Sequence, residues 1–317
     1  MRKILKLVTM LLCVCVASAC FSGCEKDLEG KIEISGDKIT MEEANSFVEQ
    51  RKKDYPQDSE VDLSAIGEWF NVDLVFTNKM TLPQDGEAAS KPQSGDSYTD
   101  FKMKGKVGFF GEDIVLDVHI DANIDPIDSN DEEIYIVSGS LIFIDDIYYV
   151  DFIKSSPSGN EEDNEVLKQM GGKEILSEYP WLEAFEFILG NYVNCEYNEN
   201  TFKTISLSPE GELTAEASKG SFTFYKAEDK IFAENKTTLF YFGNGYKNII
   251  QYEFEFEKDS SLIKNKKVYT RHYMNMEIKN ENIPLDMFLD LEILIDMQRI
   301  DPIVVVAPDL EGYEKVE

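Results

Sequence analysis

From residue 101 onward, hydrophobic and polar residues alternate with a period of two over long stretches. Phe101–Phe109 alternates apolar residues with lysines, and Asp113–Asp121 alternates them with aspartates and a histidine. A period of two is typical of strands with one buried face and one exposed face. With Gly111-Glu112 as the turn, the pattern predicts a β-hairpin whose facing lysines and aspartates pair across the strands.

The C-terminal half repeats this pattern. Residues 250–256, 268–278 and 287–297 alternate in the same way, and Asn244-Gly245 is a strong hairpin signal before the first of them. Residues 133–153 are instead apolar on both faces, which predicts strands in the middle of a sheet with a covering layer on each side. The patterns together indicate about nine to eleven strands.

Helical periodicity is confined to two places. Thr40-Met41-Glu42-Glu43 is a capping box that predicts a helix over about residues 41–53. A helical insertion is expected over about residues 164–192. Within it, Pro180 suits a first helical turn and Gly190 a position just past the end. The apolar residues between these two form one amphipathic face.

The first residues of the chain have the pattern of an export signal. A basic start is followed by Leu7–Ala19, an apolar run of 13 residues interrupted only by Thr9 and Ser18. A membrane-spanning helix needs about 20 apolar residues, so this run is too short to span and has the length of a signal-peptide core. We therefore expect residues 1–23 to be a signal peptide.

The end of this signal resembles the bacterial lipobox. Phe21-Ser22-Gly23-Cys24 has a large apolar residue and two small ones before a cysteine. The resemblance implies that Cys24 receives diacylglycerol and a fatty acid such as palmitate and becomes the N-terminus. A second register ends at Cys20 and has a weaker first residue. An ordinary cleaved signal with an unmodified Cys24 is the other alternative.

Composition changes this picture in two ways. Only Cys195 lies beyond the signal and its end, so an internal disulfide framework is excluded. The whole chain carries −30, and residues 1–23 hold three cationic groups and no acidic one, so the mature chain carries −33. An acidic surface of this strength repels nucleic acid, which we do not expect as a partner.

These patterns predict an α+β chain that is mainly antiparallel β, with a curved sheet or half-barrel and a few helices packed on one face. Residues 24–39 are expected to be the lipidated cysteine and tether, residues 40–300 a single domain, and residues 301–317 a C-terminal tail.

The layout resembles the LolA/LppX-like lipid-carrier lipoproteins. The likeness is carried by the Phe101–Ile124 hairpin, by Ser138–Phe143 turning into Tyr148-Tyr149-Val150, and by the Pro180–Gly190 insertion. It covers most of the mature chain at the level of architecture. It implies a cavity between sheet and helices that takes an acyl chain or another apolar ligand. The alternative is that the same faces meet in a solid core.

Aromatic residues at even spacing are the candidates for lining such a cavity, because residues two apart share a strand face. His272 lies on an apolar strand face and is a further candidate. The set is Phe222, Phe224, Phe240, Phe242, Tyr252, Phe254, Phe256 and His272.

One acidic segment has the oxygen-ligand spacing of a calcium loop. Asp121, Asn123 and Asp125 are followed by Glu132, but Pro126 stands where the sharp turn needs glycine. A plain acidic hairpin loop is the alternative. No nucleophile, phosphate-binding or zinc-protease motif is present, so neither an enzyme nor a cofactor is indicated.

The sequence therefore favours a lipoprotein anchored on the extracytoplasmic face of a membrane that binds an apolar or lipid-like ligand. Two alternatives remain. One is a surface lipoprotein with a solid core that binds a protein partner, and the other is a calcium-dependent module.

Overall fold

The structure is a computed structural model, and its described part excludes several predicted features. The signal, Cys24, Glu132, Cys195 and Phe242 lie outside it, as does the Gly111-Glu112 turn. The described residues are 28–56, 67–81, 98–110, 113–125, 135–156, 164–179, 181–193, 197–198, 201–207, 213–217, 221–241, 244–280 and 283–316.

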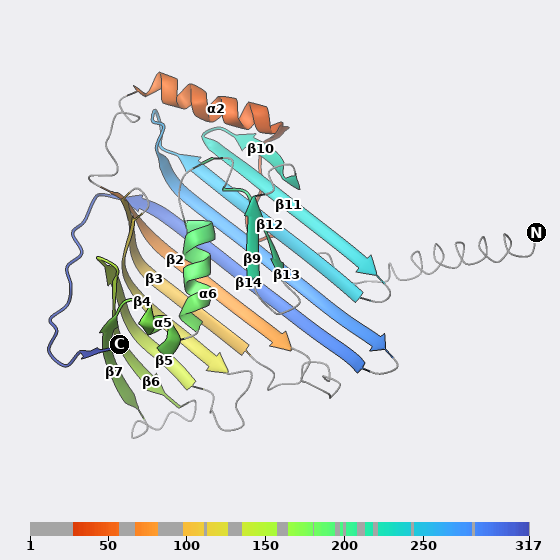
Figure 1. Cartoon of the computed structure of the whole chain (residues 1–317). Helices are drawn as coiled ribbons and strands as arrows, with labels where there is room; N and C mark the ends of the chain where they lie inside the picture. Colours follow the sequence, from red (N-terminus) through yellow and green to blue (C-terminus); the bar gives the residue numbers. More distant parts are fainter. Residues whose placement is uncertain are drawn as a thin grey trace, which may run out of the picture.

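Within the described residues, thirteen strands form one open, curled sheet (Figure 1). Its order is β1-β10-β11-β12-β13-β14-β2-β3-β4-β5-β6-β7-β15. All neighbours are antiparallel except the short β15, which is parallel to β7. The strands are β1 (Asp37–Ile39), β2 (Glu68–Thr81), β3 (Tyr98–Phe110), β4 (Asp113–Asp125), β5 (Tyr135–Ile144), β6 (Ile147–Ser155), β7 (Glu165–Gly171), β10 (Thr223–Ala227), β11 (Lys230–Tyr241), β12 (Asn244–Phe256), β13 (Ile263–Asn280), β14 (Ile283–Ile300) and β15 (Glu314–Lys315).

The expectation of a mainly antiparallel β chain with few helices is thus confirmed, and so is the predicted hairpin. β3 pairs with β4, and the register sets Lys102 opposite Asp121 and Lys106 opposite Asp117. Lys104 of β3, on the same face, forms an ion pair with the strand on the other side of β3: its Nζ lies 2.9 Å from Asp73 Oδ2 of β2. The facing charges predicted for the hairpin therefore lie next to one another, and β2 shares in the pairing.

One face of the sheet carries the main core. Every second residue of the central strands is buried, as the period of two requires. The opposite face has a smaller apolar cluster formed by Phe232, Ile249 and Tyr269. Ile32, from the segment before β1, covers this cluster and donates its backbone N–H to Gln251 Oε1 at 3.0 Å.

The N-terminal helix α2 (Met41–Asp54) lies beside β10 at one end of the sheet (Figure 1). Its predicted capping box is confirmed: Glu43 N donates to Thr40 Oγ1 at 3.2 Å, and Thr40 N donates to Glu43 Oε2 at 2.7 Å. Both contacts satisfy backbone or side-chain groups that the first helical turn leaves open.

The predicted helical insertion was wrong at both of its bounds, at its start near residue 164 and at its end near Gly190. Residues 165–171, placed in the helical insertion, form strand β7, which pairs with β6 near the sheet edge. Because an edge strand packs mainly on one neighbour, its sequence need not alternate strongly. The helical part is shorter: α5 (Glu174–Glu178), α6 (Trp181–Ile188) and the π-helical turn η2 (Leu189–Val193), which runs through Gly190.

The strands expected in the middle of the sheet lie near one end instead. β5 and β6 come tenth and eleventh in the order, and β2 and β14 are central. The second apolar face of β5 and β6 is covered only in part. Tyr313 of the C-terminal segment packs against Tyr149 with ring centroids 6.1 Å apart, whereas Ile153 is 47 % exposed.

Arg51 links α2 to the loop after β12. Its Nε donates to the carbonyl of Ser260 at 2.7 Å, Nη1 contacts Asp229 Oδ1 at 2.6 Å, and Nη2 donates to the carbonyl of Glu257. The residue is 8 % exposed, so water cannot replace these partners.

We expect Arg51→Met to lower the free energy of unfolding by about 2 to 4 kcal/mol, because buried groups lose a charged donor. The matched control is Lys52→Met, which removes only an exposed pair with Glu49 and should cost under about 0.5 kcal/mol. Urea denaturation measures both, and equal small losses would contradict the role given to Arg51.

Candidate functional site

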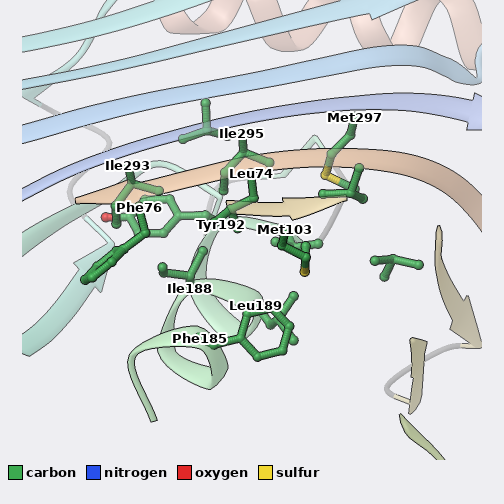
Figure 2. Packing of buried hydrophobic residues seen from close by; sticks show 14 of the residues in the cluster. Leu74, Phe76, Met103, Phe185, Ile188, Leu189, Tyr192, Ile293, Ile295 and Met297 are labelled. Atoms are coloured by element: carbon green, nitrogen blue, oxygen red, sulfur yellow. The ribbon is translucent and has the colours of Figure 1, made fainter. Parts of the chain in front are cut away.

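The helical segment α5–α6–η2 lies on the apolar face of the sheet (Figure 1). The predicted amphipathic face is confirmed, since the side chains that form it are all buried: Trp181, Leu182, Phe185, Ile188 and Leu189. Phe101 of β3 contacts Trp181 and Phe185, with ring centroids 6.1 Å and 6.3 Å apart. Figure 2 shows Phe185, Ile188 and Leu189 facing labelled side chains of β2, β3 and β14.

Directional bonds between this segment and the sheet are few in the described residues. Tyr148 of β6 donates a hydrogen bond to Glu186, and Tyr179 donates to Gln169 Oε1 at 2.6 Å. The remaining contact is apolar packing, which is non-directional and roughly proportional to buried area. An apolar ligand of similar area could therefore replace it.

The aromatic candidates on β10 and β12 come together on the same face. Phe222, Phe224, Tyr252, Phe254 and Phe256 are all buried and belong to the main core.

Phe202 lies at the centre of this group, just before β8 (Lys203–Leu207), which pairs with β9 (Leu213–Ala217) in a small separate sheet. Its ring centroid is 5.1 Å from Phe224, 5.6 Å from Phe222 and Tyr252, and 6.2 Å from Phe254. Sequence reasoning missed Phe202 because it is an isolated aromatic in a polar stretch, and no pattern marks it.

Two aromatic candidates cannot be assessed in this way. Phe240 lies in β11, but its side chain falls outside the described part of the structure, and Phe242 lies outside it altogether. The Asn244-Gly245 pair begins β12 rather than forming the loop, since Tyr241 pairs with Asn244.

His272 lies in a buried polar group on the same face. It is 3 % exposed, its Nδ1 is 3.2 Å from Tyr246 Oη, and its Nε2 is 2.9 Å from Thr270 Oγ1. Burial lowers the pKa of His272 to about 4, because an imidazolium loses its hydration there. The ring is therefore neutral at pH 7, one nitrogen donating and the other accepting.

The acidic candidates lie in a strand. Asp121, Asn123 and Asp125 are in β4, where Ser138 Oγ donates to Asp121 Oδ1 at 2.6 Å and Asn123 Nδ2 donates to Asp100 Oδ1 at 2.6 Å. Across the described residues, no group of three or more His, Cys, Asp and Glu side chains is placed to hold a metal ion. The side chains of Asp121 and Asn123 thus bind residues on neighbouring strands.

No protein-family profile and no curated protein matches the chain. Among the helices of the described residues, none has both the length and the apolar character needed to cross a membrane.

The buried His272 predicts a specific dependence of stability on pH. Its pKa is lower in the folded chain than the ordinary value of 6.5, so the unfolded chain binds the proton more readily. Stability should therefore fall as pH drops from about 6.5 towards 4, by about 2 kcal/mol between pH 7 and pH 5 from this group alone.

Urea denaturation of the wild type and His272→Gln at both pH values measures this difference, since the variant keeps the other titrating groups. His119→Gln is the matched control, because the side chain of this second histidine is 54 % exposed. The same pH dependence in wild type and His272→Gln would refute the prediction.

Proposed function

We propose that the chain is a lipid-anchored extracytoplasmic protein that binds an apolar, lipid-like ligand between its curled sheet and the α5–α6–η2 segment. In this proposal the sheet acts as a half-barrel and the helical segment as its cover. The observation that supports it most is the large apolar face of a single sheet, covered by a helical segment that is held chiefly by ring packing.

The free energy of apolar burial allows a ligand to take the place of the α5–α6–η2 segment on the sheet. Apolar burial stabilises by about 25 cal/mol per Å², whatever supplies the area. An acyl chain lying against Phe101 and the neighbouring core residues would replace the side chains of Trp181 and Phe185. The two tyrosine hydrogen bonds, made at Tyr179 and Glu186 within the segment, would set where it remains attached.

The anchor part of the proposal comes from residues 1–24. Stable anchoring takes about two lipid signals, and a diacylated cysteine carries two acyl chains. The acidic domain would then be held off anionic headgroups by charge. Residues 25–27 would be the tether, because Leu28 and Ile32 pack on the sheet and residues 37–39 form β1.

We expect the full chain, expressed in a bacterium with the lipoprotein pathway, to incorporate an alkyne-labelled fatty acid and to sediment with membranes. Cys24→Ala should lose both the label and the membrane fraction. Cys20→Ala is the matched control and should keep both. Labelling that survives in Cys24→Ala would contradict the assignment of the anchor.

The ligand part is tested on residues 25–317, because every residue of the two core clusters lies between 28 and 316. Native mass spectrometry of the purified chain is expected to show added mass that disappears after organic extraction and returns when lipid is supplied. The extracted material identifies the ligand class.

A second function is favoured by the ring packing around Phe202, which is that of a solid core. Five apolar side chains are exposed near the opposite end of the sheet and on the C-terminal segment: Ile153, Val166, Val304, Val306 and Leu310. They suit a protein-binding surface. A clean apo mass with no lipid uptake would reject the apolar-ligand proposal in favour of this one.

A further inference from the structure

A row of polar residues crosses the covered face of the sheet. The register sets Thr237, Asn248 and His272 side by side on β11, β12 and β13, and Leu291 and Asn78 continue the row on β14 and β2. Core faces of antiparallel sheets are normally apolar, and buried polar groups normally have partners. The polar row therefore calls for a physical reason.

Several polar atoms at this face lack a hydrogen-bond partner within the described residues. They include Asn78 Oδ1, Asn248 Oδ1, Tyr192 Oη and Tyr252 Oη, and each is shielded from solvent. Tyr192 is completely buried. A buried hydrogen-bonding group without a partner costs stability, so its retention points to a partner that the polypeptide itself does not supply.

Tyr192 belongs to η2 and reaches the sheet from the covering side. Figure 2 shows it alongside Phe76 and Ile293. Ile293 pairs with Thr270, whose hydroxyl contacts His272 at 2.9 Å. The helical segment and the polar row thus bring unpartnered groups to the same part of the interface.

The donors and acceptors that remain unpaired define the chemistry of a ligand that could bind them. Both ring nitrogens of His272 are engaged, and the Asn248 side chain donates to the Tyr246 hydroxyl, which leaves Asn248 Oδ1 as an acceptor. Burial, with the nearby Tyr252 and Tyr246, raises the pKa of Tyr192, which keeps its proton.

An ionised carboxylate or phosphate only accepts hydrogen bonds, so it cannot satisfy the amide oxygens. The residues of the row are uncharged at neutral pH and offer an anion no counter-charge. A neutral hydroxyl fits, because it donates to an amide oxygen and accepts from the tyrosine.

We propose that Tyr192 and Asn248, supported by Tyr246, Thr270 and His272, bind the neutral hydroxyl headgroup of a single-chain lipid of the monoacylglycerol class. Its acyl chain would lie along the adjoining apolar rows beneath α6. This inference rests on the proposed apolar-ligand function and adds the chemical class of the ligand.

Displacement of a fluorescent apolar dye from residues 25–317 tests it with three probes: 1-monooleoylglycerol, methyl oleate and oleate. They share one acyl chain and differ only in the head. Since one net hydrogen bond corresponds to about a fivefold change in affinity, 1-monooleoylglycerol should bind about five- to tenfold more tightly than methyl oleate, and more tightly than oleate at pH 8.

Tyr192→Phe should lose most of that preference and leave methyl oleate binding unchanged. It removes only an unpartnered hydroxyl, so the melting temperature should stay the same or rise. Tyr197→Phe is the matched control, because the Tyr197 hydroxyl contacts a protein group, Asn45 Oδ1, at 3.3 Å. This control should keep the wild-type preference.

Equal affinity of the wild type for 1-monooleoylglycerol and methyl oleate would overturn the headgroup site and leave the apolar-ligand function standing. Tighter binding of oleate, or an unchanged preference in Tyr192→Phe, would also overturn the site. Failure of all three probes to displace the dye would instead reject the apolar-ligand function. The wild-type comparison needs no variant to fold.

Discussion

One constraint shapes this molecule: a single sheet has one apolar face that must be kept from water without a second sheet to pack on it. The sheet curls, and the α5–α6–η2 segment, with Phe202 beside it, lies on the concave surface that results (Figure 1). A solid core and a lipid site obey the same constraint, since both fill this surface with apolar groups. The buried hydroxyl of Tyr192 and the amide oxygens of Asn78 and Asn248 favour the lipid site.

The opposite face solves a different problem. Beside the small apolar cluster that Ile32 covers, it carries paired charges: Arg271 makes two 3.0 Å bonds to Asp290, and Lys31 bridges to Glu292 at 2.8 Å. Partly exposed pairs of this kind add little stability, but they keep the face soluble. The strong negative charge of the chain and the proposed anchor at Cys24 agree with a domain that stands in water beside a membrane.

The sequence predicted those features that depend on residues close together along the chain. The capping box at Thr40, the Phe101–Ile124 hairpin and the amphipathic face of α6 follow from spacing alone. The partnership of β14 with β2 does not, since Ile300 pairs with Trp69 across most of the chain and no residue pattern names its partner. Phe202 and the polar row were missed for the same reason, because their neighbours come from separate strands.

The central claim is that the helical segment is an exchangeable cover on a fixed sheet. Hydrogen–deuterium exchange of residues 25–317, with and without 1-monooleoylglycerol, tests it most directly. The account predicts that the ligand changes exchange in residues 181–193 and leaves β12 and β13 protected as before. Protection that is unchanged in residues 181–193 while lipid is demonstrably bound would contradict it.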